Sequence, residues 1–142
     1  MGTKRPKTKT IIGRRERVDF PGLGLFGLTA KIDTGAYTAA LHCHDIAVKN
    51  GILFFKLLDP THPTYEDREQ QFSDFYEKGI KNSFGEIEKR YIIKTSVKVG
   101  GRKIKSVISL TNRGTMRYPV LIGRRMLKGK FIVDVSKLFI AP

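Results

Sequence analysis

The chain has 142 residues, of which 40% are hydrophobic and 28% charged, as expected for one soluble globular domain with a single core. Its net charge of +14 predicts attraction to an acidic partner such as nucleic acid, a ribosome surface, an acidic peptide or anionic lipid. No apolar run approaches the roughly 20 residues of a membrane span, no secretory signal is recognisable, and a lone Cys43 excludes an internal disulfide framework. We therefore expect a cytoplasmic protein without a membrane anchor.

The chain begins with a basic segment and continues as short apolar segments separated by turns. Residues 1–9 carry four cations and predict a flexible arm, and residues 10–142 are expected to form a single domain. Turn signals such as Pro21-Gly22 and Asn50-Gly51 divide the domain in a manner typical of β-barrels and sandwiches. The expected strands cover residues 10–18, 23–32, 39–48, 52–58, 88–99, 103–110, 131–135 and 138–140.

Residues 59–79 interrupt this pattern. They contain Pro60, Pro63 and six of the chain's 13 carboxylates. A loop of this length is usually functional or mobile, and we expect a short helix within it over residues 66–76. Residues 81–86 (KNSFGE) then predict the tip of a hairpin between two apolar flanks.

Residues 30–36 (AKIDTGA) place a carboxylate on a tight turn directly after an apolar strand. Gly35 allows close approach of the backbone, and the Thr34 hydroxyl can form a hydrogen bond within the turn or across an interface. An ordinary turn closing a hairpin would use the same residue types, because Asp and Gly are common in turns. The Asp-Thr-Gly triplet alone therefore leaves a catalytic and a structural interpretation open.

A second motif, residues 118–127 (YPVLIGRRML), predicts an apolar strand followed by Gly-Arg and a short helix. The order of the two motifs resembles the retropepsin-like aspartic proteases. It resembles more closely a bacterial branch historically called ATP-dependent zinc protease, which is associated with ATP-grasp ligases of ribosomal modification. The resemblance covers roughly residues 11–135 and includes residues 13–16 (GRRE), 40–42 (ALH), 88–95 (EKRYIIKT), 110–113 (LTNR) and 133–134 (VD). It departs at residues 37–39, where Tyr-Thr-Ala replaces the usual Arg-Thr-Ser.

The resemblance implies an all-β fold, a small closed retropepsin-like barrel with one short helix near the C-terminus. It also implies an aspartic endopeptidase that needs two carboxylates sharing one proton, one acting as base and one as acid. This chain has only one Asp-Thr-Gly, so the second aspartate should come from another copy in a two-fold homodimer. In the retropepsin fold the chain ends help to build that dimer interface.

The resemblance also assigns the site residues. Asp33 is the expected catalytic acid and base, and Thr34 and Gly35 hold its geometry, with Thr34 bonding across the dimer. The hairpin around residues 83–85 is the expected flap over the substrate. The expected substrate-binding residues are Ala36, Phe84 and Gly85. Arg124 and Asp134 lie in the other motifs and are interpreted as structural.

The substrate expectation comes from charge. Residues 89–130 contain 13 Lys or Arg and no carboxylate, so a cleft bordered by them would concentrate acidic peptides. The resemblance implies association with a ligase that adds glutamate tails to a ribosomal protein, which makes a glutamate-rich tail a coherent target. The same charge is equally suited to contact with ribosomal RNA.

Two other functions compete with peptidase activity. His42, Cys43 and His44 are metal-ligand types, but His62 is the only other histidine and no HExxH motif occurs. We therefore expect no metal or cofactor, with the two histidines as a packed pair and Cys43 as a buried small hydrophobe. The non-enzymatic alternative is a basic β-barrel that binds RNA or the ribosome, although the chain lacks an RNP-type aromatic motif.

Overall fold

Alternating apolar and polar residues place most of the chain in β-strands in the computed structural model, which describes residues 8–81, 84–112 and 117–142. The elements in chain order are β1 (Thr10–Gly13), β2 (Arg15–Phe20), the 3-10 helix η1 (Pro21–Leu23), β3 (Leu25–Ile32), β4 (Ala39–Lys49), β5 (Ile52–Leu57), β6 (Glu69–Phe72), β7 (Tyr76–Lys81), β8 (Ile87–Val99), β9 (Arg102–Thr111), β10 (Val120–Ile122), α1 (Arg124–Leu127) and β11 (Phe131–Asp134).

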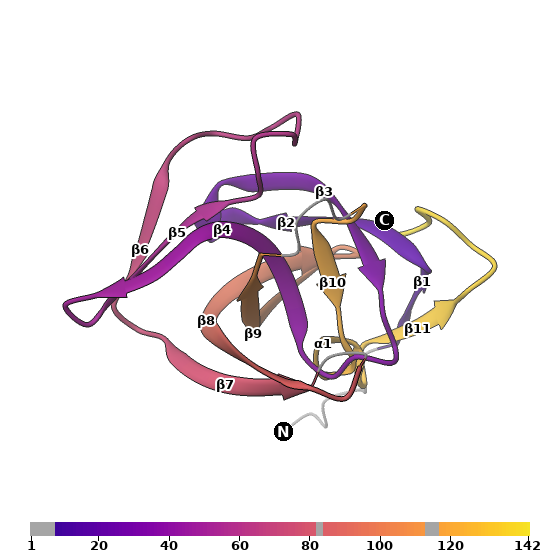
Figure 1. The fold of residues 1–142 in the computed structure, drawn as a ribbon. Coiled ribbons are helices and arrows are strands. Elements are labelled where there is room, and N and C mark those ends of the chain that lie inside the picture. Colours follow the sequence, from indigo (N-terminus) through magenta and orange to yellow (C-terminus); the bar gives the residue numbers. More distant parts are fainter. Residues whose placement is uncertain (1–7, 82–83, 113–116) are drawn as a thin grey trace, which may run out of the picture.

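Six of these strands close into a barrel in the order β10-β3-β2-β8-β9-β4. Closure depends on β10, which runs parallel to β3 through Ala30 to Ile32 and antiparallel to β4 through Ala40 and Leu41. Figure 1 shows β10 between these two strands. The expected all-β closed barrel with one short helix near the C-terminus is therefore confirmed.

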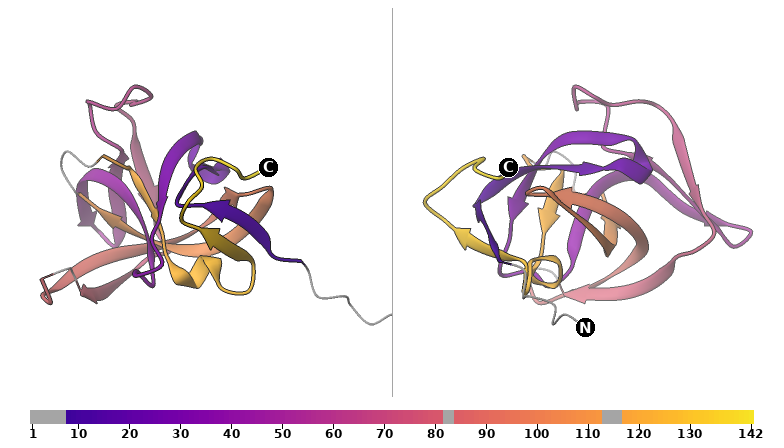
Figure 2. Two further views of the ribbon diagram at one scale, coloured as in Figure 1. Left: turned by 90° about the vertical axis from the view of Figure 1, so that its right-hand side faces the viewer. Right: turned by 180° about the vertical axis from the view of Figure 1, so that it is seen from behind.

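Three additions extend the barrel. Strands β5 and β6 continue outward from the second half of β4, and β7 pairs with the first half of β8 to form a long hairpin. Strands β1 and β11 form a separate parallel pair on the other side of the barrel from β5 and β6. The left view of Figure 2 shows the β7–β8 hairpin projecting away from the barrel.

The core lies inside the barrel, and the alternation of each strand fills it. On β8 and β9 most inward side chains are apolar, as with Ile93, Val97 and Ile108, each at most 1% exposed. Their neighbours Lys94 and Lys98 point outward and are exposed. This alternation decides which side chains of β8 and β9 face the core. The pairing of the two strands keeps its register from Tyr91 to Val99.

Three local expectations were wrong. The strand expected over residues 10–18 is two strands, because Gly13 lies against the Lys137 carbonyl at a corner where a Cβ atom would come within 2.5 Å of that oxygen. The helix expected over residues 66–76 does not form, because β6 pairs with the free edge of β5 and β7 pairs with β8. Residues 138–140 are not a strand but an irregular segment held by Glu16.

Some expectations fall outside the described residues. Apart from residues 8 and 9, the arm expected over residues 1–9 is not described, and neither is residue 83 of the expected flap tip. Among the helices of the described part, none is long and apolar enough to cross a membrane.

Candidate active site

Asp33 lies where β3 leaves the barrel, on a turn fixed by backbone hydrogen bonds. The Asp33 amide donates to the Ile122 carbonyl at 2.9 Å, which extends the β3–β10 pairing by one residue. The Gly35 amide donates to Asp33 Oδ1 at 3.0 Å, and the Ala36 amide donates to the Asp33 carbonyl at 3.2 Å. The turn is therefore Asx-type, and no hydrogen bond within the described part of the chain occupies Asp33 Oδ2.

The first residues of α1 hold this turn in place through backbone hydrogen bonds. The Arg124 and Arg125 amides donate to the carbonyls of Ala36 and Tyr37 at 2.8 and 3.0 Å. Gly123 makes this contact possible, because a Cβ atom there would lie 2.6 Å from the Tyr37 carbonyl oxygen. Figure 1 shows α1 close to the turn after β3, so the two sequence motifs meet in space.

The Arg124 side chain contacts the turn directly. Its Nη1 donates to the Thr34 carbonyl at 3.1 Å, and its guanidinium carbon lies 5.8 Å from the centre of the Tyr37 ring. This side chain therefore holds the backbone one residue beyond Asp33 and brings a positive charge to the turn.

An open cleft of about 900 Å³ lies over the turn and under the β7–β8 hairpin. Asp33, Gly35, Ala36 and Phe84 all line it, so the structure brings together most of the predicted site residues. Thr34 and Gly85 adjoin these residues without being among the described residues that line the cleft. The other lining residues are Tyr37, Thr38, Ala40, Lys78, Gly79, Ile80, Lys81, Glu88, Arg90, Thr111, Asn112, Leu121 and Arg124.

The sequence predicted a basic border for the cleft but not which charged residues of the hairpin share a face, because that depends on strand register. Lys78 lies opposite Arg90 and Ile80 opposite Glu88 across the β7–β8 ladder, so these four residues share one face of the hairpin. Glu88 accepts a hydrogen bond from Arg90 at 3.0 Å. The alternation within residues 88–95, already singled out as a motif, was the signal that could have revealed this face.

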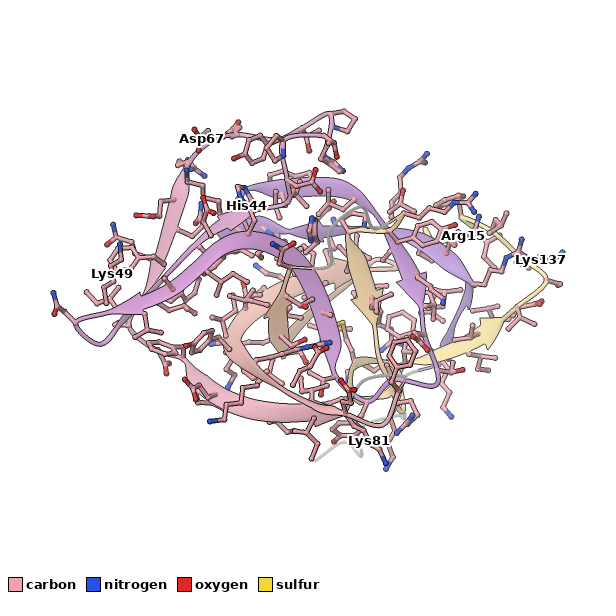
Figure 3. All side chains as sticks on the ribbon, in the orientation of Figure 1. Arg15, His44, Lys49, Asp67, Lys81 and Lys137 are labelled. Atoms are coloured by element: carbon pink, nitrogen blue, oxygen red, sulfur yellow. The ribbon has the colours of Figure 1, made fainter. Side chains whose placement is uncertain are left out.

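The tip of the β7–β8 hairpin suits a flap. Phe84 is 88% exposed although it lines the cleft, and Gly85 has φ +80°, a conformation that favours glycine. Figure 3 labels Lys81 at the end of β7, where the hairpin reaches its tip. An apolar ring with this much exposed surface buries little area in the fold and lies where it can contact a bound ligand.

Replacing Phe84 with Ala should therefore affect turnover and not stability. We expect the variant to raise KM or lower kcat several-fold, because a flap closes on its ligand. Its melting temperature should stay within about 2 °C of the wild type, since exposed positions rarely contribute more than about 0.5 kcal/mol. Steady-state kinetics and a thermal melt check both parts. Unchanged kinetics with a clearly lower melting temperature would make Phe84 a packing residue.

The histidines face the acidic loop. His42 Nε2 lies 2.7 Å from Asp59 Oδ2, and His44 Nε2 lies 3.0 Å from the Tyr65 hydroxyl. The Thr61 hydroxyl and amide, together with His42, hold the pKa of Asp59 below its usual value. Cys43 points into the core with no exposed surface, and burial raises the pKa of its thiol. The two histidines thus anchor the loop after β5.

Among the described residues, no group of three His, Cys, Asp or Glu is close enough to hold a metal ion. Asp134, interpreted as structural, accepts hydrogen bonds from the amide and hydroxyl of Ser136 at 3.0 and 2.6 Å.

The comparisons with known proteins agree with the barrel and the two motifs. The model of the RimB-like family, described as retropepsin-like aspartic endopeptidase RimB, matches residues 11–142. The chain belongs to this family. The match includes the Asp-Thr-Gly turn, the β7–β8 hairpin and the strand and helix that brace the turn.

Sequences similar to this chain also occur within longer proteins. A probable alpha-L-glutamate ligase of Shewanella halifaxensis is 36% identical over 141 residues, covering 92% of this chain and 30% of that protein. One of Parasynechococcus marenigrum is 32% identical over 130 residues, covering 89% and 28%. The chain thus spans under a third of the length of these curated relatives.

A solved structure shares the fold. It is that of Lpg0085, a Legionella pneumophila protein of unknown function, at a TM-score of 0.68 and 28% identity. The similarity covers 95% of this chain and all of that one.

Proposed function

We propose that the chain is an aspartic endopeptidase that works as a homodimer with one catalytic Asp33 in each copy. The observation that carries this proposal is the position of Asp33, on an Asx-type turn that opens into a cleft covered by a hairpin. Membership of a retropepsin-like aspartic endopeptidase family supports the same reaction. A peptide-library digest tests it: wild-type protein should cut a defined set of bonds, and the Asp33→Ala variant should cut none of them.

In the proposed reaction the two aspartates, one from each copy, share a single proton. The ionised carboxylate takes a proton from a water molecule, and the resulting hydroxide attacks the peptide carbonyl. The protonated carboxyl gives its proton to the carbonyl oxygen, which produces a neutral gem-diol intermediate. The intermediate then collapses: one of its hydroxyls gives its proton to the aspartate that is now ionised, the C–N bond breaks, and the amine leaves with the proton of the other aspartate. Gly35 and Arg124 hold the turn in place during these steps through their contacts to Asp33 Oδ1 and the Thr34 carbonyl.

The chain ends offer the apolar surface that a dimer would need. Ile11 and Ile132 are paired across the β1–β11 ladder and are 53% and 52% exposed. Val135, Phe139 and Ile140 follow in the next segment and are 70%, 41% and 42% exposed. Exposed apolar side chains gathered in this way are typical of an interaction surface.

The cleft favours an acidic peptide, which we propose as the substrate class. Its lining carries four cations, Lys78, Lys81, Arg90 and Arg124, against the two carboxylates Asp33 and Glu88. The relatives named as glutamate ligases support a link to glutamate chemistry, and glutamate-rich tails are the substrate that this charge would attract.

A glutamate-rich peptide should be cut with higher kcat/KM than a neutral peptide that shares the same cleavage sequence. The advantage should shrink between low and physiological salt, because exposed charges are screened over about 8 Å at physiological ionic strength. Lys78→Gln/Lys81→Gln should reduce the advantage several-fold, whereas Lys49→Gln, at the far end of β4, should leave it unchanged. Equal rates for both peptides at every salt concentration would exclude this substrate preference.

The non-enzymatic alternative, a basic barrel that binds RNA or the ribosome, is tested in the same experiments. A protein that only binds would show no specific cleavage and would keep its affinity for the partner when Asp33 is replaced.

A further inference from the structure

The outer face of the β8–β9 ladder carries a cluster of lysines that the proposed active site does not use. Residues 94, 96 and 98 of β8 lie opposite residues 107, 105 and 103 of β9, so the six side chains share one face. Four of them are lysines, all exposed: Lys94, Lys98, Lys103 and Lys105. Ser96 and Val107 complete this surface, which we call the lysine face.

The lysine face concentrates positive charge, and the nearby carboxylate of Asp19 offsets only part of it. Lys98 and Lys103 are directly opposite each other, an arrangement that places the two Cβ atoms about 5 Å apart and destabilises a sheet. Among the described residues, none of the four ammonium groups lies within 4 Å of a carboxylate. The carboxylate nearest in register is that of Asp19 on β2, which lies opposite Lys98 of β8. Asp19 accepts a hydrogen bond from the Gly27 amide at 2.8 Å.

The lysine face is separate from the cleft. Arg90, on the same strand, lines the cleft, but Ile92 lies between Arg90 and Lys94 and is only 1% exposed. The exposed basic surface is therefore interrupted between the two sites. A peptide held under the β7–β8 hairpin does not account for the lysines further along β8.

The chemistry of the lysine face fits the backbone of a nucleic acid. Lysines two residues apart on a strand are separated by about 7 Å, so the face presents a closely spaced array of point charges. The face has no aromatic side chain on which an unpaired base could stack, which disfavours single strands. The outer face of a barrel is too broad to enter a deep, narrow groove, but it can lie on the wide, shallow minor groove of an RNA helix. Ser96, between Lys94 and Lys98, offers a hydroxyl that can bond a ribose 2′-OH.

We propose that the lysine face of β8 and β9 binds double-helical RNA through its phosphate backbone. This binding is independent of the peptidase reaction, because it uses none of the residues that line the cleft. It would hold the enzyme on an RNA-containing partner while the cleft remains open to a peptide.

The test measures affinity for a labelled RNA duplex of roughly two helical turns at several salt concentrations. In Lys98→Gln/Lys103→Gln we expect a loss of about tenfold or more at low salt, and a slope of log affinity against log salt that is shallower by about two. The melting temperature should stay the same or rise, because the substitution removes a repulsive pair. Cleavage of a neutral peptide should not change.

The matched control is Lys49→Gln/Lys137→Gln, which removes the same charge at two distant positions labelled in Figure 3. It should lose no more than about twofold in RNA affinity, as expected for screened, distant charges. If both double variants lost the same RNA affinity, the effect would come from net charge alone and the proposal would be overturned. Three other results would also overturn the proposal. The first is unchanged RNA affinity in Lys98→Gln/Lys103→Gln, and the second is equal affinity for a DNA duplex. The third is displacement of the bound RNA by polyglutamate at matched charge.

Discussion

Replacing Asp33 with Asn should abolish peptide cleavage and leave the fold intact. The asparagine side-chain oxygen can still accept the 3.0 Å hydrogen bond from the Gly35 amide, so the turn should keep its shape. The variant cannot take a proton from water, and losing a general acid or base typically lowers the rate by about 10²–10⁴-fold. We expect at least a 10³-fold loss of kcat/KM, at the upper part of that range, because the substitution removes both carboxylates of the dimer at once.

The control for this experiment is Asp19→Asn. Asp19 also accepts an amide hydrogen bond, from Gly27 at 2.8 Å, but it lies on β2 and does not line the cleft. This variant should keep wild-type kcat/KM, and both variants should have melting temperatures close to the wild type. Cleavage by Asp33→Asn at the wild-type rate would show that Asp33 is a turn residue only.

The largest expected effect on stability is at Glu16. Its side chain is 1% exposed and accepts three backbone hydrogen bonds, from Gly13 at 2.7 Å, Ile140 at 3.1 Å and Ala141 at 3.2 Å. Glu16→Ala would leave these amides without their acceptor and would weaken the attachment of the C-terminal segment to β2. We expect a loss of about 3–5 kcal/mol in the free energy of unfolding, as when one partner of a buried charged interaction is removed.

Two variants locate the cause of that loss. Glu16→Gln keeps one carbonyl oxygen and nearly the same volume, so it should cost clearly less than Glu16→Ala. Glu66→Ala removes an exposed carboxylate and should change the unfolding free energy by no more than about 0.5 kcal/mol. Chemical denaturation of the three variants measures the differences. If Glu16→Ala lowered the free energy of unfolding by less than about 1 kcal/mol, Glu16 would not hold the C-terminal segment in place as proposed.

The barrel could be predicted from the sequence because its strands can be recognised from their own residues. Strands such as residues 39–49 and 87–99 alternate apolar and polar side chains or end at clear turns, so their expected ranges agree with the structure to within one residue. The acidic segment had no such signal. Strand β6 forms because the edge of β5 is available and Phe72 packs on Phe55, with 5.6 Å between ring centres, and neither reason is local in sequence.

The candidate site was predictable only at its centre. The Asp-Thr-Gly motif indicated a tight turn at Asp33, and a hairpin tip with Phe84 and Gly85 was visible as a turn signal. The role of Arg124 required a contact between residues 90 positions apart in the chain. The cations Lys78 and Arg90 required the register of β7 against β8, which the sequence does not specify in advance.

The most direct test of the central claim is a subunit-mixing experiment with wild-type protein and the Asp33→Asn variant. The two are mixed in equal amounts, allowed to exchange subunits, and assayed for peptide cleavage at constant total protein. If each active site needs an Asp33 from both copies, only wild-type pairs are active, and the mixture should retain about a quarter of the wild-type activity. Retention of about half, which is the value for independently active chains, would contradict the shared site.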